Sequence, residues 1–357
     1  MGSLTALLRR RLGVIGPVLL ALLAVALASA ACGGPIPGAV QPAGPVVDPP
    51  AAAATATDAP SPTATATLPP SPTPTLTPTT SPTATATPSP TPTETPTPTA
   101  TTTALPTPDG VVREARVPIL MYHYLSDPPR GADRYRRDLS VSPALFEQHL
   151  AYLRDQGYQS ITLEQLLRNL ALGEPLPERP VIITFDDGYA DNYANAFPLL
   201  EQYGFSGTFF VVTELAERAS AGMTEPDGTV YADEYMTWQQ MQEMQAAGMD
   251  IQCHARVHED LTDMDDERLI WQVLGCSEMI ESNLGQRPRF VAYPSGIYDQ
   301  RVAQFFASDA YWGGITTKQG SVQRSDDLFE LQRLRIRGTT TVSELDELLA
   351  WGVGNGE

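Results

Sequence analysis

From residue 109 onward, apolar positions along the chain follow two alternating patterns. Short, continuous apolar runs are typical of strands buried on both faces, and the segments between them place apolar residues three and four positions apart, as helices on a sheet do. The run at 181–185 is the clearest strand. Phe146, Leu150 and Leu153 mark one face of a helix. Strands are expected at 117–121, 159–162, 181–185, 207–212, 249–253, 290–293, 314–317 and 331–336, and helices at 143–156, 163–172, 193–203, 237–247, 265–284, 300–307 and 342–349.

Alternation of strands and helices predicts an α/β fold whose strands run parallel. We expect an irregular (β/α) barrel of about seven parallel strands rather than an open, doubly wound sheet. In such a barrel the carboxyl ends of the strands carry the chemistry, so the polar residues that directly follow strands are the candidates for a site.

The first 32 residues predict export. Residues 12–31 are almost wholly apolar, follow three arginines and end in small residues before Cys32. This order is typical of a secretory signal, and Cys32 resembles the lipidated cysteine of bacterial lipoproteins. An uncleaved transmembrane anchor is the alternative, since about twenty apolar residues can span a bilayer. In both cases we expect a protein of the cell envelope, attached to the membrane on its extracytoplasmic side only through 1–32.

Residues 33–108 are rich in Pro, Thr and Ala and contain hardly an aromatic side chain. Such a composition cannot bury enough apolar surface to fold, so we expect a disordered, semi-rigid spacer. The remaining segment, 109–357, has the length of a single barrel domain. We expect this domain to be monomeric.

The charge balance excludes one class of partner. With 42 acidic and 23 basic residues, the formal net charge is −19. Such a balance argues against nucleic acid as a partner and is compatible with a neutral or cationic glycan.

Two adjacent carboxylates, Asp186 and Asp187, directly follow one expected strand. His254 and His258 directly follow another, and one turn of helix would place both imidazoles on the same side. Burying neighbouring carboxylates is costly unless a cation or hydrogen bonds compensate. Two imidazoles and one carboxylate leave an open position for water on a zinc-like metal, and the second carboxylate is then free to act as a base. The sequence therefore predicts a metal-dependent hydrolase.

The motif Thr-Phe-Asp-Asp-Gly at 184–188, with the His254 and His258 pair downstream, resembles the polysaccharide deacetylase family, the NodB-homology fold of carbohydrate esterase family 4. The resemblance covers essentially the whole expected barrel. It implies that Asp187, His254 and His258 hold a divalent metal, usually zinc, and that Asp186 is the general base. It also implies hydrolysis of N-acetyl groups on an N-acetylglucosamine-containing polysaccharide of the cell envelope, with release of acetate.

His123 is the candidate general acid. Many family members use a histidine near the C-terminus, but here no histidine follows His258. The segment 118–123 instead resembles the subgroup that acts on poly-N-acetylglucosamine, in which the acid histidine comes early. Closure of a barrel brings the first and last strands together, so an early histidine can reach the same site. The alternative is a histidine that only ends its strand.

Segment 290–296 resembles the family's third motif, in which a backbone N–H stabilises the oxyanion. By position this residue is Ser295, where an aromatic residue is usual. Ala292 stands where many members have an arginine that orients the base, and Arg333 is our candidate replacement. Ala255 takes the place of the usual Ser or Thr after the first metal histidine, which would loosen the support of that ligand.

Four further side chains have both a functional and a structural interpretation. Tyr311 and Trp312 could stack on a sugar face, or they could simply pack in the barrel. Cys253 and Cys276 could form a disulfide in an exported protein, although spacing alone does not give their separation. We take free thiols, with Cys253 packed beside the metal site, as the default.

Three other functions remain compatible with the sequence. One is a structural wall tether, which the spacer supports and the Asp-Asp-Gly motif does not. An O-acetyl esterase or a small-amide hydrolase would keep the metal ligands and change the substrate groove. A non-catalytic glycan-binding lipoprotein of the envelope would fit the missing arginine and aromatic residue of the third motif, but it has no need of an open metal site.

Overall fold

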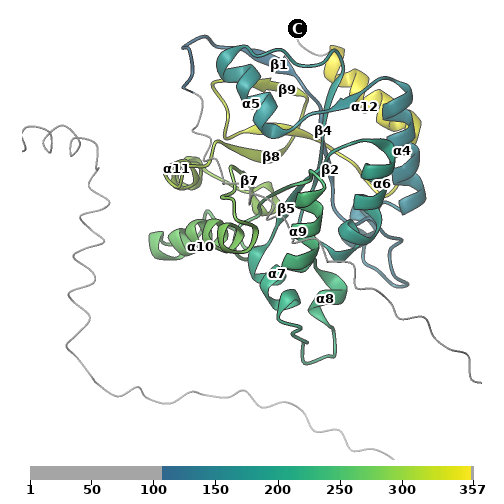
Figure 1. The fold of residues 1–357 in the computed structure, drawn as a ribbon, viewed down its shortest axis with the longest axis vertical. Coiled ribbons are helices and arrows are strands. Elements are labelled where there is room, and N and C mark those ends of the chain that lie inside the picture. The colour runs from purple at the N-terminus through teal and green to yellow at the C-terminus, as the bar shows by residue number, and fades with distance from the viewer. Residues whose placement is uncertain (1–106, 355–357) are drawn as a thin grey trace, which may run out of the picture. The chain divides into compact units, whose positions relative to one another are not determined.

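Seven parallel strands close into a barrel in the computed structural model, which describes residues 107–354 (Figure 1). Their order is β2-β10-β8-β7-β6-β5-β4, and β4 pairs again with β2. The strands are β2 (Ile119–Tyr122), β4 (Pro180–Phe185), β5 (Thr208–Val211), β6 (Asp250–Cys253), β7 (Phe290–Ala292), β8 (Gly313–Gln319) and β10 (Leu331–Arg335). The predicted irregular barrel of about seven strands is confirmed.

Strand β2 closes the barrel, because it lies between β4 and the last strand, β10. Leu120 is in register with Leu334 of β10, and Ile119 is in register with Ile182 of β4. The pairing of β10 with β8 shifts register between Leu331 and Arg333, one source of the barrel's irregularity. The early and late parts of the chain therefore meet at one rim of the barrel. His123, which follows β2, can reach the candidate site only if they do.

Helices pack around the outside of the barrel (Figure 1). Ser142 caps α4 by accepting a hydrogen bond from the backbone N–H of Leu145, and Thr162 and Thr237 form capping boxes at α5 and α9. The helices are α3 (Arg134–Leu139), α4 (Pro143–Asp155), α5 (Leu163–Leu172), α6 (Phe197–Tyr203), α7 (Thr213–Ser220), α8 (Tyr231–Glu234), α9 (Trp238–Ala246), α10 (Asp266–Leu284), α11 (Gln300–Ser308) and α12 (Val342–Gly354), with a π-helical turn η1 (Asn192–Ala196) and a 3-10 turn η2 (Pro294–Gly296).

Side chains of each strand divide between two apolar clusters, because successive residues point to opposite faces. Val181, Ile183 and Phe185 of β4 pack with residues of the surrounding helices. Ile182 belongs to the other cluster, together with apolar residues of the remaining strands and of α5. The face that carries Ile182 is therefore the barrel interior, and Asp186 lies on this face.

The apolar pattern missed several short elements. The antiparallel pair of β1 (Glu114–Arg116) and β9 (Val322–Arg324) contains no apolar run, because β1 is largely solvent-exposed and the buried residue of β9, Gln323, is polar. Helix α7 begins at Thr213, directly after the apolar run at 207–212, and no helix was expected there. The expected strand at 159–162 is reduced to β3 (Gln159–Ser160), which pairs with the start of β4.

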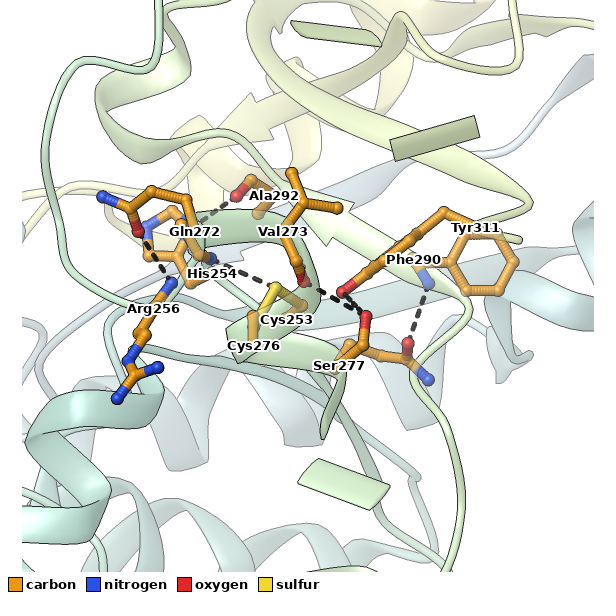
Figure 2. Close-up of a disulfide and its surroundings, with 12 residues drawn as sticks. Cys253, His254, Arg256, Gln272, Val273, Cys276, Ser277, Phe290, Ala292 and Tyr311 are labelled. Carbon is orange, nitrogen blue, oxygen red and sulfur yellow. Dashed lines mark hydrogen bonds between the residues drawn. A yellow bond between two sulfur atoms is a disulfide. The ribbon is translucent and has the colours of Figure 1, made fainter. Parts of the chain in front are cut away.

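Cys253 and Cys276 form a disulfide between the end of β6 and α10 (Figure 2). Our default of free thiols is therefore wrong, because barrel packing brings two cysteines 23 positions apart into contact. A crosslink that closes a loop of this length contributes about 3 kcal/mol to stability in the chain-entropy description.

The predicted signal or anchor (1–32), with Cys32, lies outside the described residues, as do almost all of the predicted spacer (33–108) and the last three residues of the domain 109–357. These expectations stay predictions. Among residues 107–354, no helix has the length and apolar character needed to span a membrane.

Asp250 at the start of β6 gives the fold a pH dependence that can be measured. Burial raises the pKa of Asp250 to about 6, although its carboxylate accepts a hydrogen bond from Gln252 Nε2 at 2.7 Å. Because the unfolded value is about 4, the folded state binds this proton more tightly, and the free energy of unfolding falls as the pH rises from about 4 to 6.

We expect Asp250→Asn to be more stable than the wild type at pH 7 by about 1–2 kcal/mol and equally stable near pH 4. Urea unfolding at both pH values measures the difference, with Asp233→Asn on the exposed face of α8 as the control for charge alone. If Asp250→Asn were more stable than the wild type by the same amount at both pH values, the raised pKa of Asp250 would not be the cause.

Candidate functional site

The candidate site lies at the carboxyl ends of the barrel strands. His123 follows β2, Asp186 and Asp187 follow β4, and His254 follows β6 directly. The parallel strands bring these ends to a single rim. Tyr122 is in register with Phe185 and its carbonyl accepts a hydrogen bond from Asp186 N–H at 3.0 Å, so His123 lies beside the carboxylates. The sequence-predicted residues are thus brought together.

Asp186 and Arg333 form a buried ion pair inside the barrel. Arg333 Nη1 and Nη2 each donate to one carboxylate oxygen of Asp186 at 2.7 Å, and both residues are at most 2% exposed. Arg333 Nε donates to the carbonyl of Thr316 at 2.8 Å, which fixes the plane of the guanidinium. The structure therefore places Arg333 in contact with the candidate base, where Ala292 offers no side chain that could do so.

The ion pair sets the charge of Asp186. Burial alone would raise the pKa of Asp186, but the charge and hydrogen bonds of Arg333 outweigh burial and hold the pKa below its ordinary value. Asp186 is consequently a carboxylate at neutral pH. Each carboxylate oxygen keeps a further lone pair beyond the one that Arg333 occupies.

Asp187 turns toward the same rim as Asp186 because its backbone leaves the strand conformation. Its φ is +73°, in the left-handed region that non-glycine residues rarely adopt. A regular strand would point Asp187 to the face opposite Asp186. The positive φ instead allows both carboxylates to serve one rim, and Gly188, with φ of +76°, continues the turn.

Asp187, His254 and His258 converge as one candidate metal site. Asp187 Oδ1 lies 3.2 Å from His254 Nε2 and 3.4 Å from His258 Nε2. The three ligand atoms lie within 4.8 Å of one another. Burial raises the pKa of Asp187, but the hydrogen bond and charge of His254 outweigh it and lower the pKa well below the ordinary value, so this carboxylate is anionic.

The loop 254–258, which carries both histidines, is not helical. The sequence-based expectation of one helical turn is wrong, because Ala255 adopts a φ of +62° and the segment bends instead. The loop still directs both imidazole Nε2 atoms toward Asp187.

His254 is oriented by the next strand. Its Nδ1 donates to the carbonyl oxygen of Ala292 in β7 at 2.6 Å, so Nε2 is the atom that faces Asp187 and that would present its lone pair to a metal (Figure 2). This arrangement is typical of metal-ligating histidines. The donor set of one carboxylate and two imidazoles, with one imidazole oriented in this way, fits a divalent metal such as zinc.

The imidazole of His123 has one buried nitrogen, Nδ1, that makes no hydrogen bond among the described residues. Burial lowers the pKa of His123, although Asp186 and Asp187 act in the opposite direction. An unsatisfied buried nitrogen costs free energy, which is typical of a group that acquires its partner only when substrate binds.

Ser295 follows β7 in the short turn η2, at the same rim. It is exposed and adopts a φ of +56°. Among the described residues, the non-glycine residues with positive φ are Asp187, Ala255, Ser295 and Ala310, so three of these four lie in the segments that carry the candidate site. The proposed role of the Ser295 N–H stays a prediction.

Tyr311 and Trp312 do not form a sugar platform. They are 2% and 3% exposed, and the Tyr311 hydroxyl accepts a hydrogen bond from Ser277 Oγ in α10. Barrel packing accounts for both.

The sequence analysis missed an aromatic stack beside Asp187. Tyr189 packs against Tyr124 with ring centroids 3.5 Å apart and against Tyr235 at 5.6 Å. The guanidinium of Arg136 lies over Tyr124, 3.1 Å from the ring centroid. Tyr124 directly follows His123 and Tyr189 directly follows the Asp-Asp-Gly turn, so their adjacency to site residues was the available signal.

Comparison with known proteins agrees with this geometry. Residues 173–311 match the family model described as "Polysaccharide deacetylase". The chain is 28% identical over 224 residues to the polysaccharide deacetylase YxkH of Bacillus subtilis, covering 63% of this chain and 72% of that protein. It is 31% identical over 126 residues to the poly-beta-1,6-N-acetyl-D-glucosamine N-deacetylase of Escherichia coli, covering 35% of this chain but only 18% of that protein.

A solved structure extends the likeness across the barrel. The Streptococcus pyogenes deacetylase PplD, crystallised with acetate, is 29% identical, with a TM-score of 0.58 over 66% of this chain and 99% of that chain. IcaB from Ammonifex degensii, at 24% identity and a TM-score of 0.52, shares the fold. Residues 173–311 therefore match a polysaccharide deacetylase domain, as the sequence motifs predicted.

Proposed function

We propose that this protein is a zinc-dependent deacetylase that removes N-acetyl groups from an N-acetylglucosamine-containing polysaccharide of the cell envelope and releases acetate. The observation that carries the proposal is the pairing of two groups at one rim. Asp187, His254 and His258 can hold a metal, and the ionised Asp186, held by Arg333, lies directly beside them.

The roles of the residues follow from their positions. A divalent ion bound by Asp187, His254 and His258 would supply Lewis-acid polarisation of the acetamide carbonyl. Asp186 accepts a proton from the attacking water. The Ser295 N–H donates to the carbonyl oxygen as negative charge develops there, and His123 donates a proton to the departing nitrogen. Water and the amide are thereby converted to acetate and a free amine.

The polysaccharide substrate is supported by the relatives and by a cavity. The Escherichia coli relative is named for poly-beta-1,6-N-acetyl-D-glucosamine. A cavity of about 660 Å³ lies between the ends of β8 and β10 and helix α12, and its lining includes Gln319, Arg335 and Glu344. Arg335 is in register with Met121 of β2, two residues before His123, so one residue of the cavity lining lies near the candidate acid, while no candidate site residue lines the cavity itself. A volume of this order accommodates sugar units that flank the reacting one.

The place of action is part of the proposal. The export signal, the lipidated Cys32 or membrane anchor, and the Pro/Thr-rich spacer would together present the domain to envelope polysaccharide at a distance from the membrane.

Acetate release is the direct test. We expect zinc-loaded protein to release acetate from N-acetylglucosamine oligomers, chelator to abolish the release, and added zinc to restore it. Asp187→Asn should bind zinc weakly and remain inactive. If metal-replete protein released no acetate from any N-acetylglucosamine polymer but did so from O-acetylated sugars, the esterase alternative would replace the deacetylase.

The substitution Arg333→Met tests the role of Asp186 without changing a candidate metal ligand. Without the guanidinium, Asp186 is a buried carboxylate with no countercharge, so its pKa rises. We expect kcat/KM at pH 7 to fall by at least about 100-fold and the acid limb of the pH–rate profile to move to higher pH. Arg333→Lys keeps the positive charge but cannot make both hydrogen bonds, so its kcat/KM should lie between those of the wild type and Arg333→Met. An unchanged acid limb in Arg333→Met would argue against Asp186 as the base.

His123→Ala tests the general acid. We expect kcat to fall by about 100-fold or more while zinc affinity stays unchanged, because His123 is not a ligand. A general acid must be protonated, so the decline of the wild-type rate at high pH should disappear in the variant. Unchanged turnover would remove His123 from the mechanism and leave the metal and the base in place.

A further inference from the structure

The loop 254–258 owes its shape to helix α10. Gln272, in the second turn of α10, is fully buried, and its Oε1 accepts hydrogen bonds from the backbone N–H groups of Arg256 at 3.1 Å and Val257 at 2.9 Å (Figure 2). Val257 directly precedes His258. A single side-chain oxygen therefore holds the backbone immediately before one candidate metal ligand.

Helix α10 holds the other end of the loop through the disulfide. Cys276 lies four residues after Gln272 and is bonded to Cys253, the residue before His254 (Figure 2). Residues four positions apart lie on the same face of a helix, and this face of α10 is turned to the loop. The N–H of Ala255 also points to Cys253 Sγ at 3.2 Å.

The loop needs such support because it has left regular structure. With Ala255 at positive φ, the N–H groups of Arg256 and Val257 have no strand or helix partner, and buried donors must be satisfied. The carbonyls of the loop are held from the other side, where Glu214 N–H at the start of α7 donates to Arg256 O at 2.9 Å. Gln272 supplies the matching acceptor.

We propose that Gln272 is a positioning residue for the metal site, which fixes the backbone of the loop so that His258 Nε2 faces Asp187. The inference rests on the proposed function, because it assumes that Asp187, His254 and His258 bind zinc. Gln272 touches neither metal nor substrate and acts only through the loop.

The chain provides a matched control. Gln252 is also buried, at 4% exposed, and its Oε1 accepts two backbone N–H groups, those of Arg289 and Phe290, both at 2.8 Å. Replacing either glutamine by leucine removes an acceptor from two backbone donors. Gln252 holds the start of β7 rather than the loop, so a purely structural effect would be alike in both variants.

The experiment compares the zinc affinity of full-length wild type, Gln272→Leu, Gln252→Leu and Gln272→Glu by competition with a chromophoric chelator. Gln272→Leu should bind zinc at least about 10-fold more weakly, while Gln252→Leu should stay within about 2-fold of the wild type despite a similar loss of stability to urea. Gln272→Glu keeps an acceptor oxygen and should recover most of the affinity. Amide exchange at Arg256 and Val257 should accelerate in Gln272→Leu alone.

Equal zinc affinities for Gln272→Leu and the wild type, or an equal loss in both leucine variants, would overturn the positioning role. If Gln272→Leu did not fold, Gln272→Asn, whose amide is one methylene short of the loop, would be measured under the same criterion. Failure of wild-type protein to bind zinc would instead overturn the proposed function, and the two failures are distinguished by the wild-type measurement.

Discussion

The ion pair of Asp186 and Arg333 is the constraint around which the barrel is arranged. Taking both charges out of water costs several kcal/mol per ion, and hydrogen bonding in the interior at best offsets that cost. Such a pair is therefore poor evidence of a device for stability. Its effect is to keep a carboxylate ionised and fixed in orientation where apolar surroundings would otherwise protonate it. It also requires β10 and β4 to flank the same strand, so the closure of the barrel and the charge of the candidate base depend on each other.

The backbone angle φ of Asp187 determines that the side chains of Asp186 and Asp187 have different partners. Asp186 continues the inward face of β4 and meets Arg333, whereas the positive φ of Asp187 turns that side chain to the histidines. Strain of this kind is tolerated where the surroundings determine the conformation completely. The same conformation recurs at Ala255 in the histidine loop, which α10 and the start of α7 hold from two sides.

Periodicity in the sequence predicted the barrel because buried strands and their covering helices leave strong apolar patterns. It failed for β1, whose residues are largely exposed, and for β9, whose buried residue Gln323 is polar. It also failed for the histidine loop, where the i and i+4 spacing suggested a helix that the backbone of Ala255 does not form. Arg333 and Asp186 are 147 positions apart in the sequence. Their contact could be suggested only because closure of a barrel places β2 between β10 and β4 and so brings the ends of β10 and β4 close together. Exposure was not predictable at Tyr311 and Trp312, since an aromatic residue after a helix fits a groove and a core equally well. Gln272 gave no signal, because a glutamine inside an amphipathic helix is ordinary until its backbone partners are known.

The candidate site has two halves, which are supplied by different sets of strands. The candidate metal ligands come from β4 and the loop after β6, which belong to three neighbouring strands that are consecutive in the chain. The candidate acid and the partner of the base come from β2 and β10, which become neighbours only when the last strand docks. A chain that ended after β7 would contain every candidate metal ligand, together with the groups of α10 and β7 that hold them, but not the arginine that keeps Asp186 ionised. Metal binding thus depends on the middle of the chain, while turnover also requires the final strand.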